Sequence, residues 1–239
     1  MEVAIVLTVF GHYHLARLRA CQGWTDKSVV GVEVVGGKGI TGIARWRATQ
    51  GRETVRIRKI FEVRDYCEWR AKDILRGVSQ TLSMLRPAVA VVPGWSDYSA
   101  LAALYWCQRN RVPAVMLSET TEHDEPRVFW KEAVKRRVVR MCGAALTGGS
   151  QHAAYLRKLG LSPHSVLTGY DVVDNDHFSS GLRGEGRLQR GQKGKQGVMD
   201  HYFLASARFV VKKNLLRLLE AYARYRQMAS TAEKMEHGH

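Results

Sequence analysis

The sequence has no apolar run close to the roughly 20 residues that a helix needs to cross a bilayer. Its first residues form a strand-like apolar run at 3–7, without the charged segment that precedes the apolar part of a signal peptide. We therefore expect a soluble protein of the cytoplasm. With 239 residues and 45% hydrophobic content, the chain has room for one large α/β domain or one and a half ordinary domains.

Cysteine is also scarce. The four cysteines lie far apart and have no CxxC spacing, which indicates neither a zinc site nor a disulfide framework. They are Cys21, Cys67, Cys107 and Cys142. We expect buried free thiols at these positions.

Acidic residues are fewer than basic ones: the chain has 22 Asp and Glu against 37 Lys and Arg, which gives a net charge of +15. An excess of this size attracts polyanions, and nucleic acid, anionic lipid and phosphorylated ligands all qualify. The basic residues are scattered rather than interleaved with stacking aromatics, and no nucleic-acid-binding motif is visible. No specific nucleic-acid partner is therefore expected.

Short β-branched apolar segments alternate with segments of helical period along residues 1–178. Strands are predicted at 3–9, 29–35, 55–61, 89–92, 114–117, 144–147 and 166–168, and helices at 14–21, 69–85, 98–109, 128–141 and 152–159. Asp97 and Ser150 are the expected N-caps of the third and last helices, and Gly160 fits the end of the last. This alternation predicts a Rossmann-like parallel sheet with helices on both faces.

Residues 179–200 have a different composition, rich in Gly, Gln, Arg and Lys, which predicts a flexible linker. Residues 201–228 are expected to form a strand at 202–206, a cationic turn and a helix from 215 to 225. Residues 229–239 are expected to be a tail. One strand and one helix are too few for a second core, so the chain is expected to be truncated within a second domain.

Ligands in open parallel sheets lie beyond the carboxyl ends of the strands. After the first predicted strand, Gly11 allows close approach of a ligand, and Tyr13 or His14 can hydrogen-bond an acceptor hydroxyl. A turn glycine and a helix-capping histidine explain the same residues. After the fourth strand, Trp95 suits packing against a sugar ring and equally suits the core.

The loop at 118–127 is dense in acidic groups. Glu119 and Asp124 are candidates to hold sugar hydroxyls or to accept a proton from an attacking hydroxyl. A solvated charged loop is the alternative. Metal binding by His123 and its acidic neighbours is disfavoured, because adjacent residues make poor joint ligands.

The predicted helix at 128–141 has an apolar stripe with five basic residues around it. Such a helix can pack its stripe against the sheet while the cations stay in water. Basic helices with an interfacial Trp can instead lie on anionic membranes. Peripheral attachment to the inner membrane face therefore stays open.

Arg208 and Lys213 flank the turn that precedes the last predicted helix. Cations beside a helix N-terminus and its free N–H groups can together bind a phosphate or diphosphate. A solvated loop is the alternative.

Residues 207–222 resemble the G-R-x-x-x-x-K-G/N-x-x-x-L-x-x-A segment of the family 4 glycosyltransferases, with Ala207 in place of the usual Gly. Residues 143–178 resemble the end of that family's N-terminal domain, with Gly169, Tyr170 and Asp171 matching its G-Y/V-D-x-x-x-F loop. The resemblance implies a GT-B fold, with 1–178 as the acceptor-side domain and 201–228 as the start of the donor domain.

The resemblance also implies an activity, the transfer of a sugar from a nucleotide-sugar to a glycan or small-molecule acceptor hydroxyl with retention. By position, Arg208 and Lys213 would hold the donor diphosphate, and neither a metal nor a separate cofactor is required. The family's E-x7-E segment is missing, and the loop at 93–97 lacks the histidine of many members, so no catalytic histidine is assigned.

We therefore expect little or no activity from this chain alone. The alternative function is a non-catalytic remnant or a module that binds an anionic partner.

Overall fold

The computed structural model describes residues 2–24, 26–35, 55–61, 69–176, 179, 203–207 and 209–236. Contacts divide the chain into two compact units, Met1–Ser180 and Gly181–His239. We refer to them as the sheet unit and the second unit. The predicted linker at 179–200, apart from residue 179, lies outside the described residues.

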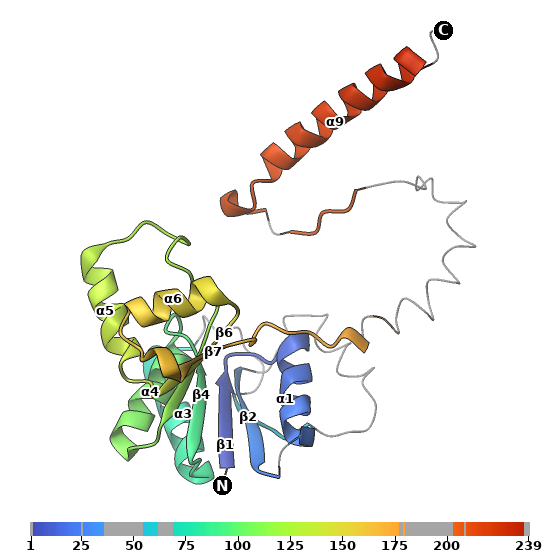
Figure 1. Cartoon of the computed structure of the whole chain (residues 1–239). Coiled ribbons are helices and arrows are strands. Elements are labelled where there is room, and N and C mark those ends of the chain that lie inside the picture. Colours follow the sequence, from blue (N-terminus) through green and yellow to red (C-terminus); the bar gives the residue numbers. More distant parts are fainter. Residues whose placement is uncertain are drawn as a thin grey trace. The chain divides into compact units, whose positions relative to one another are not determined.

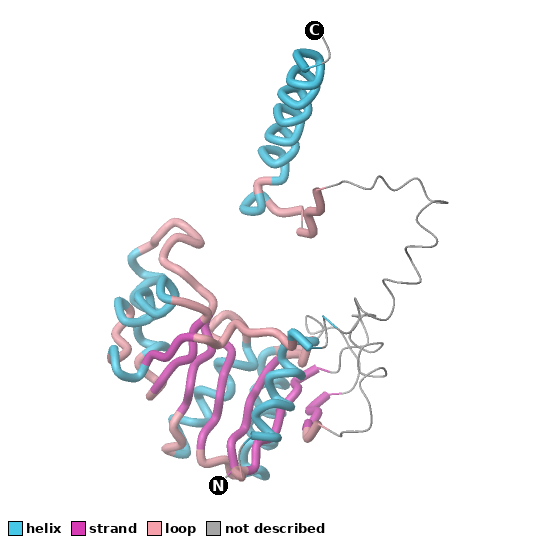
Figure 2. Tube along the Cα trace, turned by 45° about the vertical axis from the view of Figure 1, so that its right-hand side comes forward, coloured by secondary structure: helices cyan, strands magenta, loops and turns pink. Residues whose placement is uncertain are grey.

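The sheet unit is built on a seven-stranded sheet in which all six neighbouring strand pairs are parallel. The strands are β1 (Glu2–Leu7), β2 (Ser28–Val35), β3 (Ile57–Phe61), β4 (Val89–Pro93), β5 (Ala114–Ser118), β6 (Ala144–Thr147) and β7 (Val166–Thr168). The strands lie side by side in one sheet (Figure 2). Their order across it is β3-β2-β1-β4-β5-β6-β7. The predicted α/β class with a parallel sheet is confirmed.

Five helices of the sheet unit follow the predicted periodicity. They are α1 (His12–Trp24), α3 (Ala71–Leu85), α4 (Tyr98–Asn110), α5 (Phe129–Val139) and α6 (Ser150–Lys158) (Figure 1). The larger part of the core packs β1, β2 and β4 against α3 and α4, around Val32, Val78 and Leu104. A smaller cluster around Phe10 and Leu18 packs beside α1. The sheet is therefore covered on both faces.

The predicted helix caps are confirmed at two of three positions. The Asp97 carboxylate accepts a hydrogen bond of 2.8 Å from the Ala100 N–H, and Gly160 ends the last helix at φ +110°. Ser150 as an N-cap is wrong, because Gly149 holds that position in an extended conformation. Ser150 is already the first helical residue, so its hydroxyl does not cap the following turn.

The cysteine expectation is confirmed in part. Cys107 and Cys142 are free and buried, and burial raises the pKa of the Cys107 thiol to about 11. Cys21 is free but exposed. Cys67 lies outside the described residues. Within the described part of the chain, no helix has both the length and the apolarity to cross a bilayer.

The second unit differs from its prediction in two places. Residues 203–206 have no regular structure, so the predicted strand at 202–206 is wrong over these residues. A strand exists by pairing, and none of the described residues pairs with this segment. The helix predicted at 215–225 is α9 and runs from Leu215 to Glu236. It includes most of the expected tail, because residues 230–236 contain no Gly or Pro and several good helix formers.

Candidate functional site

The order of the strands reverses direction between β1 and β4. The chain adds β2 and β3 on one side of β1 and then adds β4 to β7 on the other side. In sheets of this kind, the loops after the two strands at the reversal diverge and leave room for a ligand. The loops that follow β1 and β4 are therefore the first candidates for a binding site.

Hydrogen bonds join these two loops directly. The Thr8 hydroxyl donates to the Asp97 carboxylate over 3.0 Å and lies 3.0 Å from the Ser99 hydroxyl. Ser99 also donates to Asp97, which at the same time caps α4. This polar cluster holds the start of α4 beside the end of β1.

A buried carboxylate fixes the backbone of the loop after β1. Glu33 of β2 is fully buried, and its Oε1 accepts a 2.9 Å hydrogen bond from the Phe10 N–H. Phe10 is also buried, so the chain is anchored just before Gly11. Apart from the two chain neighbours of Gly11, no atom of the described residues lies within 4 Å of where a side chain at this position would start, and Tyr13 is exposed. Space for a ligand is therefore open at Gly11.

His14 is neutral and largely enclosed. Its Nδ1 is buried without a hydrogen-bond partner among the described residues. Burial, assisted by the nearby Arg17 charge, lowers the pKa of His14 from 6.5 to about 4. At neutral pH this imidazole is uncharged, so any contact that it makes with a ligand is a neutral hydrogen bond or packing.

An apolar groove of about 360 Å³ runs along α1 on the sheet surface. Its floor is formed by side chains of β1, β4, β5 and β6, including Ile5, Val91 and Leu146. His14, Arg17 and Tyr170 are its main polar groups. A groove with this lining accommodates apolar or amphiphilic groups better than free sugar hydroxyls.

Arg17 ties the loop after β7 to α1. Its guanidinium donates to the Asp171 carboxylate and to the Val172 carbonyl, each over 3.0 Å, and lies 4.3 Å from the centre of the Tyr170 ring. Burial raises the pKa of Tyr170, and the charge of Glu119 acts in the same direction. Glu119 is therefore within electrostatic reach of this loop, at an exposed position after β5.

Asp124 has a local role within its own loop. Its carboxylate accepts a 2.8 Å hydrogen bond from the Thr121 N–H, and its side chain is exposed. The neighbouring Glu122 is paired with Lys158 of α6, so this acidic loop is partly held by α6.

Trp95 packs inward more than it faces solvent. It lies against the main core cluster and meets the Tyr155 ring edge-on, with a centroid distance of 6.4 Å. The Tyr155 hydroxyl lies 2.8 Å from Glu132 Oε2 and 2.7 Å from Arg127. Of the two interpretations left open for Trp95, the contacts favour packing in the core.

A group of polar residues around His152 lies after β6. Nδ1 of His152, from α6, is buried without a hydrogen-bond partner among the residues that the structure describes. It lies 3.6 Å from where a Gly148 side chain would start, and Asp171 lies 3.4 Å from the same point. A side chain at position 148 would therefore press on both groups.

The predicted diphosphate site lies in the second unit. Arg208 is outside the described residues. Lys213 is exposed at the end of the 3-10 turn Val211–Lys213, and its N–H donates to the Val210 carbonyl over 2.9 Å. Asn214 follows in the left-handed conformation, at φ 48°, and α9 begins at Leu215. Lys213 is therefore next to a helix N-terminus, as the sequence predicts.

Sequence reasoning missed three anchoring residues, Arg17, Glu33 and Tyr155. Their partners lie far along the chain, as between Arg17 and Asp171. The one available signal was the charged Glu33 within an apolar strand, since such residues are almost never buried unless they have a partner.

No protein-family model matches the sequence, and no curated protein matches it. Solved structures do match. UDP-GlcNAc 2-epimerase from Neisseria meningitidis, bound to UDP-GlcNAc, has a TM-score of 0.60 at 11% identity, over 84% of this chain and 54% of that one. Anabaena HepE in complex with UDP-glucose has a TM-score of 0.53 at 11% identity, over 79% and 50%. S. aureus MnaA with UDP has a TM-score of 0.52 at 14% identity, over 73% and 48%.

This chain thus spans about half the length of the structures that it matches. At these identities the likeness shows the fold, which is one half of a GT-B structure. The GT-B architecture expected from the resemblance is confirmed at this level. The structures named above were solved with UDP or a UDP-sugar bound.

Proposed function

We propose that this chain provides the acceptor side of an enzyme that transfers a sugar from a nucleotide-sugar to an acceptor hydroxyl. The observation that carries the proposal is the fold match to structures that bind UDP or UDP-sugars. The region around the loops after β1 and β4, which the Thr8–Asp97 hydrogen bond joins, is the proposed acceptor site. Gly11, Tyr13, His14 and Glu119 border it in this proposal, and Asp124 is a further candidate base.

The donor diphosphate is proposed to bind Arg208, Lys213 and the N-terminus of α9. Cations and helix N–H groups placed there stabilise the negative charge that develops on the departing diphosphate. This scheme uses no metal. The proposed location is the cytoplasm.

Because the chain covers about half of each matched structure, we propose that it has little or no turnover by itself. Selective stabilisation of the transition state needs a donor pocket formed from both sides of the cleft. The test is turnover by the chain as it stands, and by a longer chain that carries a complete second domain, with UDP-sugars and an acceptor panel. Robust turnover by the present chain would contradict this part of the proposal.

In the longer chain, Lys213→Ala is expected to lower kcat by roughly 100- to 1,000-fold, as for removal of one oxyanion-hole donor. The matched control is Arg226→Ala, which removes an exposed cation elsewhere on α9. Equal rates for Lys213→Ala and the control would remove Lys213 from the site.

Epimerisation is a second candidate, because several of the matched structures are UDP-GlcNAc 2-epimerases. The two reactions differ in whether the chemistry depends on an acceptor. Product formation that requires an acceptor hydroxyl supports transfer, whereas conversion of the UDP-sugar alone supports epimerisation. A non-catalytic module for an anionic partner is the third candidate, favoured by the net charge of +15. Absence of both reactions in the longer chain would support it.

A further inference from the structure

Helix α5 leaves most of its apolar side chains outside the core. Phe129 is 90% exposed, Trp130 63% and Val134 57%, while Val139 is the one buried residue of this helix. Seven of its eleven residues are exposed. The apolar stripe seen in the sequence therefore does not pack on the sheet as a whole, and three large side chains face outward.

Cations lie among these apolar side chains. Lys131, Arg136 and Arg137 of α5 are exposed, as is Arg140 just beyond its end. Within the described ranges, none of these four forms an ion pair. Lys131 lies over the Trp130 ring, 5.6 Å from its centroid.

The one carboxylate of α5 is paired with cations. Glu132 contacts Lys135 at 3.0 Å and Arg127 at 3.2 Å, and also contacts the buried Tyr155. In the preceding loop, Glu122 is paired with Lys158, and Glu125 is exposed. The outward charge of the helix itself is therefore positive.

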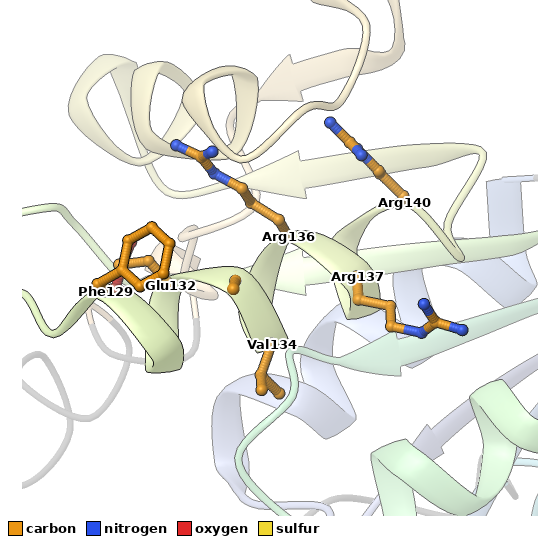
Figure 3. Close-up of a pocket in the computed structure, with 7 residues that line it drawn as sticks. Phe129, Glu132, Val134, Arg136, Arg137 and Arg140 are labelled. Atoms are coloured by element: carbon orange, nitrogen blue, oxygen red, sulfur yellow. The ribbon is translucent and has the colours of Figure 1, made fainter.

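The exposed side of α5 forms an open depression of about 700 Å³, which Figure 3 shows. Arg136 and Arg140 extend to one side of the helix and Val134 to the other, with Phe129 at its N-terminal end. Aromatic, aliphatic and cationic side chains thus line one open depression, together with Glu132, whose carboxylate is paired with Lys135 and Arg127.

We infer that the exposed face of α5 docks on an anionic lipid bilayer. Unpaired cations fit anionic headgroups, and Phe129, Trp130 and Val134 fit the boundary between headgroups and acyl chains, where aromatic side chains are favoured. A nucleic-acid backbone would use the cations but would leave Phe129 and Val134 in water. The bilayer is therefore the partner that accounts for both kinds of side chain. This inference does not depend on sugar transfer.

The test is co-sedimentation of the whole chain with vesicles of phosphatidylcholine alone and of phosphatidylcholine with about 30% phosphatidylglycerol. Binding is expected only to the anionic vesicles, and weaker at 0.5 M NaCl because salt screens exposed charges. The double variant Arg136→Gln with Arg137→Gln is expected to bind roughly 25-fold more weakly, at about five-fold for each basic residue near an anionic surface.

The matched control is Lys72→Gln with Arg76→Gln, which removes two exposed cations from α3 and should bind like the parent. A second variant, Phe129→Ala with Trp130→Ala, keeps every charge and is expected to weaken binding on the order of ten-fold. Thermal melts check that both α5 variants remain folded, and Arg137→Gln alone replaces any variant that does not.

Three outcomes overturn the inference. One is no binding of the parent to anionic vesicles, and another is equal loss in the α3 control. The third is binding to a single-stranded oligonucleotide that requires Arg136 and Arg137 while vesicle binding does not, which would assign this face to nucleic acid.

Discussion

Similar apolar sequence patterns lead to buried side chains in the sheet unit and to exposed side chains in the second unit. In α4 of the sheet unit, Leu104 is fully buried, whereas in α9 of the second unit Leu219 is 64% exposed. Both segments have the spacing of an amphipathic helix, and both form one. Apolar periodicity therefore specifies the helix, but burial requires neighbouring elements that only the sheet unit supplies within the described residues.

The largest expected contrast is between truncations in these two helices. Leu104→Ala should lower the free energy of unfolding of the sheet unit by about 2–5 kcal/mol, because it leaves a cavity in the core. Leu219→Ala should change it by less than about 0.5 kcal/mol, since its side chain is exposed. Chemical denaturation followed by tryptophan fluorescence measures this, because all six tryptophans precede residue 181. A similar cost for both substitutions would show that α9 is buried in solution.

Burial also lowers the proton affinity of His14 in the sheet unit. The resulting dependence of stability on pH is the next largest expected effect. The pKa of His14 is about 4 in the folded protein and 6.5 when unperturbed, so the unfolded state binds more protons between these values. The contribution of neutral His14 to the free energy of unfolding is therefore intact above pH 6.5. It is lost as the pH falls towards 4, to a total of about 3 kcal/mol.

Denaturation of the parent and of His14→Gln from pH 7 to pH 4 isolates this effect. The parent should lose more stability than the variant over this range. His164→Gln, at an exposed position, is the control and should behave like the parent. Parallel curves for the parent and His14→Gln would contradict the burial of this imidazole.

A smaller difference in stability is expected between Gly→Ala substitutions at a crowded glycine and at an open one. A methyl group on Gly31 would start 2.7 Å from Leu18 and 2.9 Å from Phe10, so Gly31→Ala should cost about 1–3 kcal/mol through overpacking. Among the described residues, apart from its chain neighbours and the backbone of its own helix, no atom lies within 4 Å of the same point at Gly23 in α1, so Gly23→Ala should stabilise by up to about 1 kcal/mol. Thermal melts decide this, and equal melting temperatures would show that β2 can move away from α1.

Local patterns were enough to predict most of the sheet unit. Each of the seven strands was found from its apolar β-branched run, and the Asp97 cap from its position before a helical pattern. The prediction at Ser150 was wrong because two small residues, Gly149 and Ser150, both suit a helix start. The strand predicted at 202–206 was wrong over residues 203–206 because its pattern is local, whereas a strand forms only with a partner.

The candidate site was less predictable for the same reason. The sequence pointed to the loops after β1 and β4, and the structure joins these loops through Thr8 and Asp97. The sequence did not point to Arg17 or Glu33, because the roles of these residues arise from contacts with Asp171 and Phe10, which lie elsewhere in the chain. Residues that bind a ligand directly can be predicted from the local sequence. Residues that position other residues cannot, because their partners lie far along the chain.

The central place of β1 has a consequence for how the protein is made. Ala4 pairs with Val30 on one side and with Ala90 on the other. The second partner leaves the ribosome much later than the first, and a contact across so long a loop forms slowly. A nascent chain therefore carries its central strand with one edge open until β4 has been synthesised. During that interval an open apolar edge can pair with the wrong strand, so chaperone binding would matter most then.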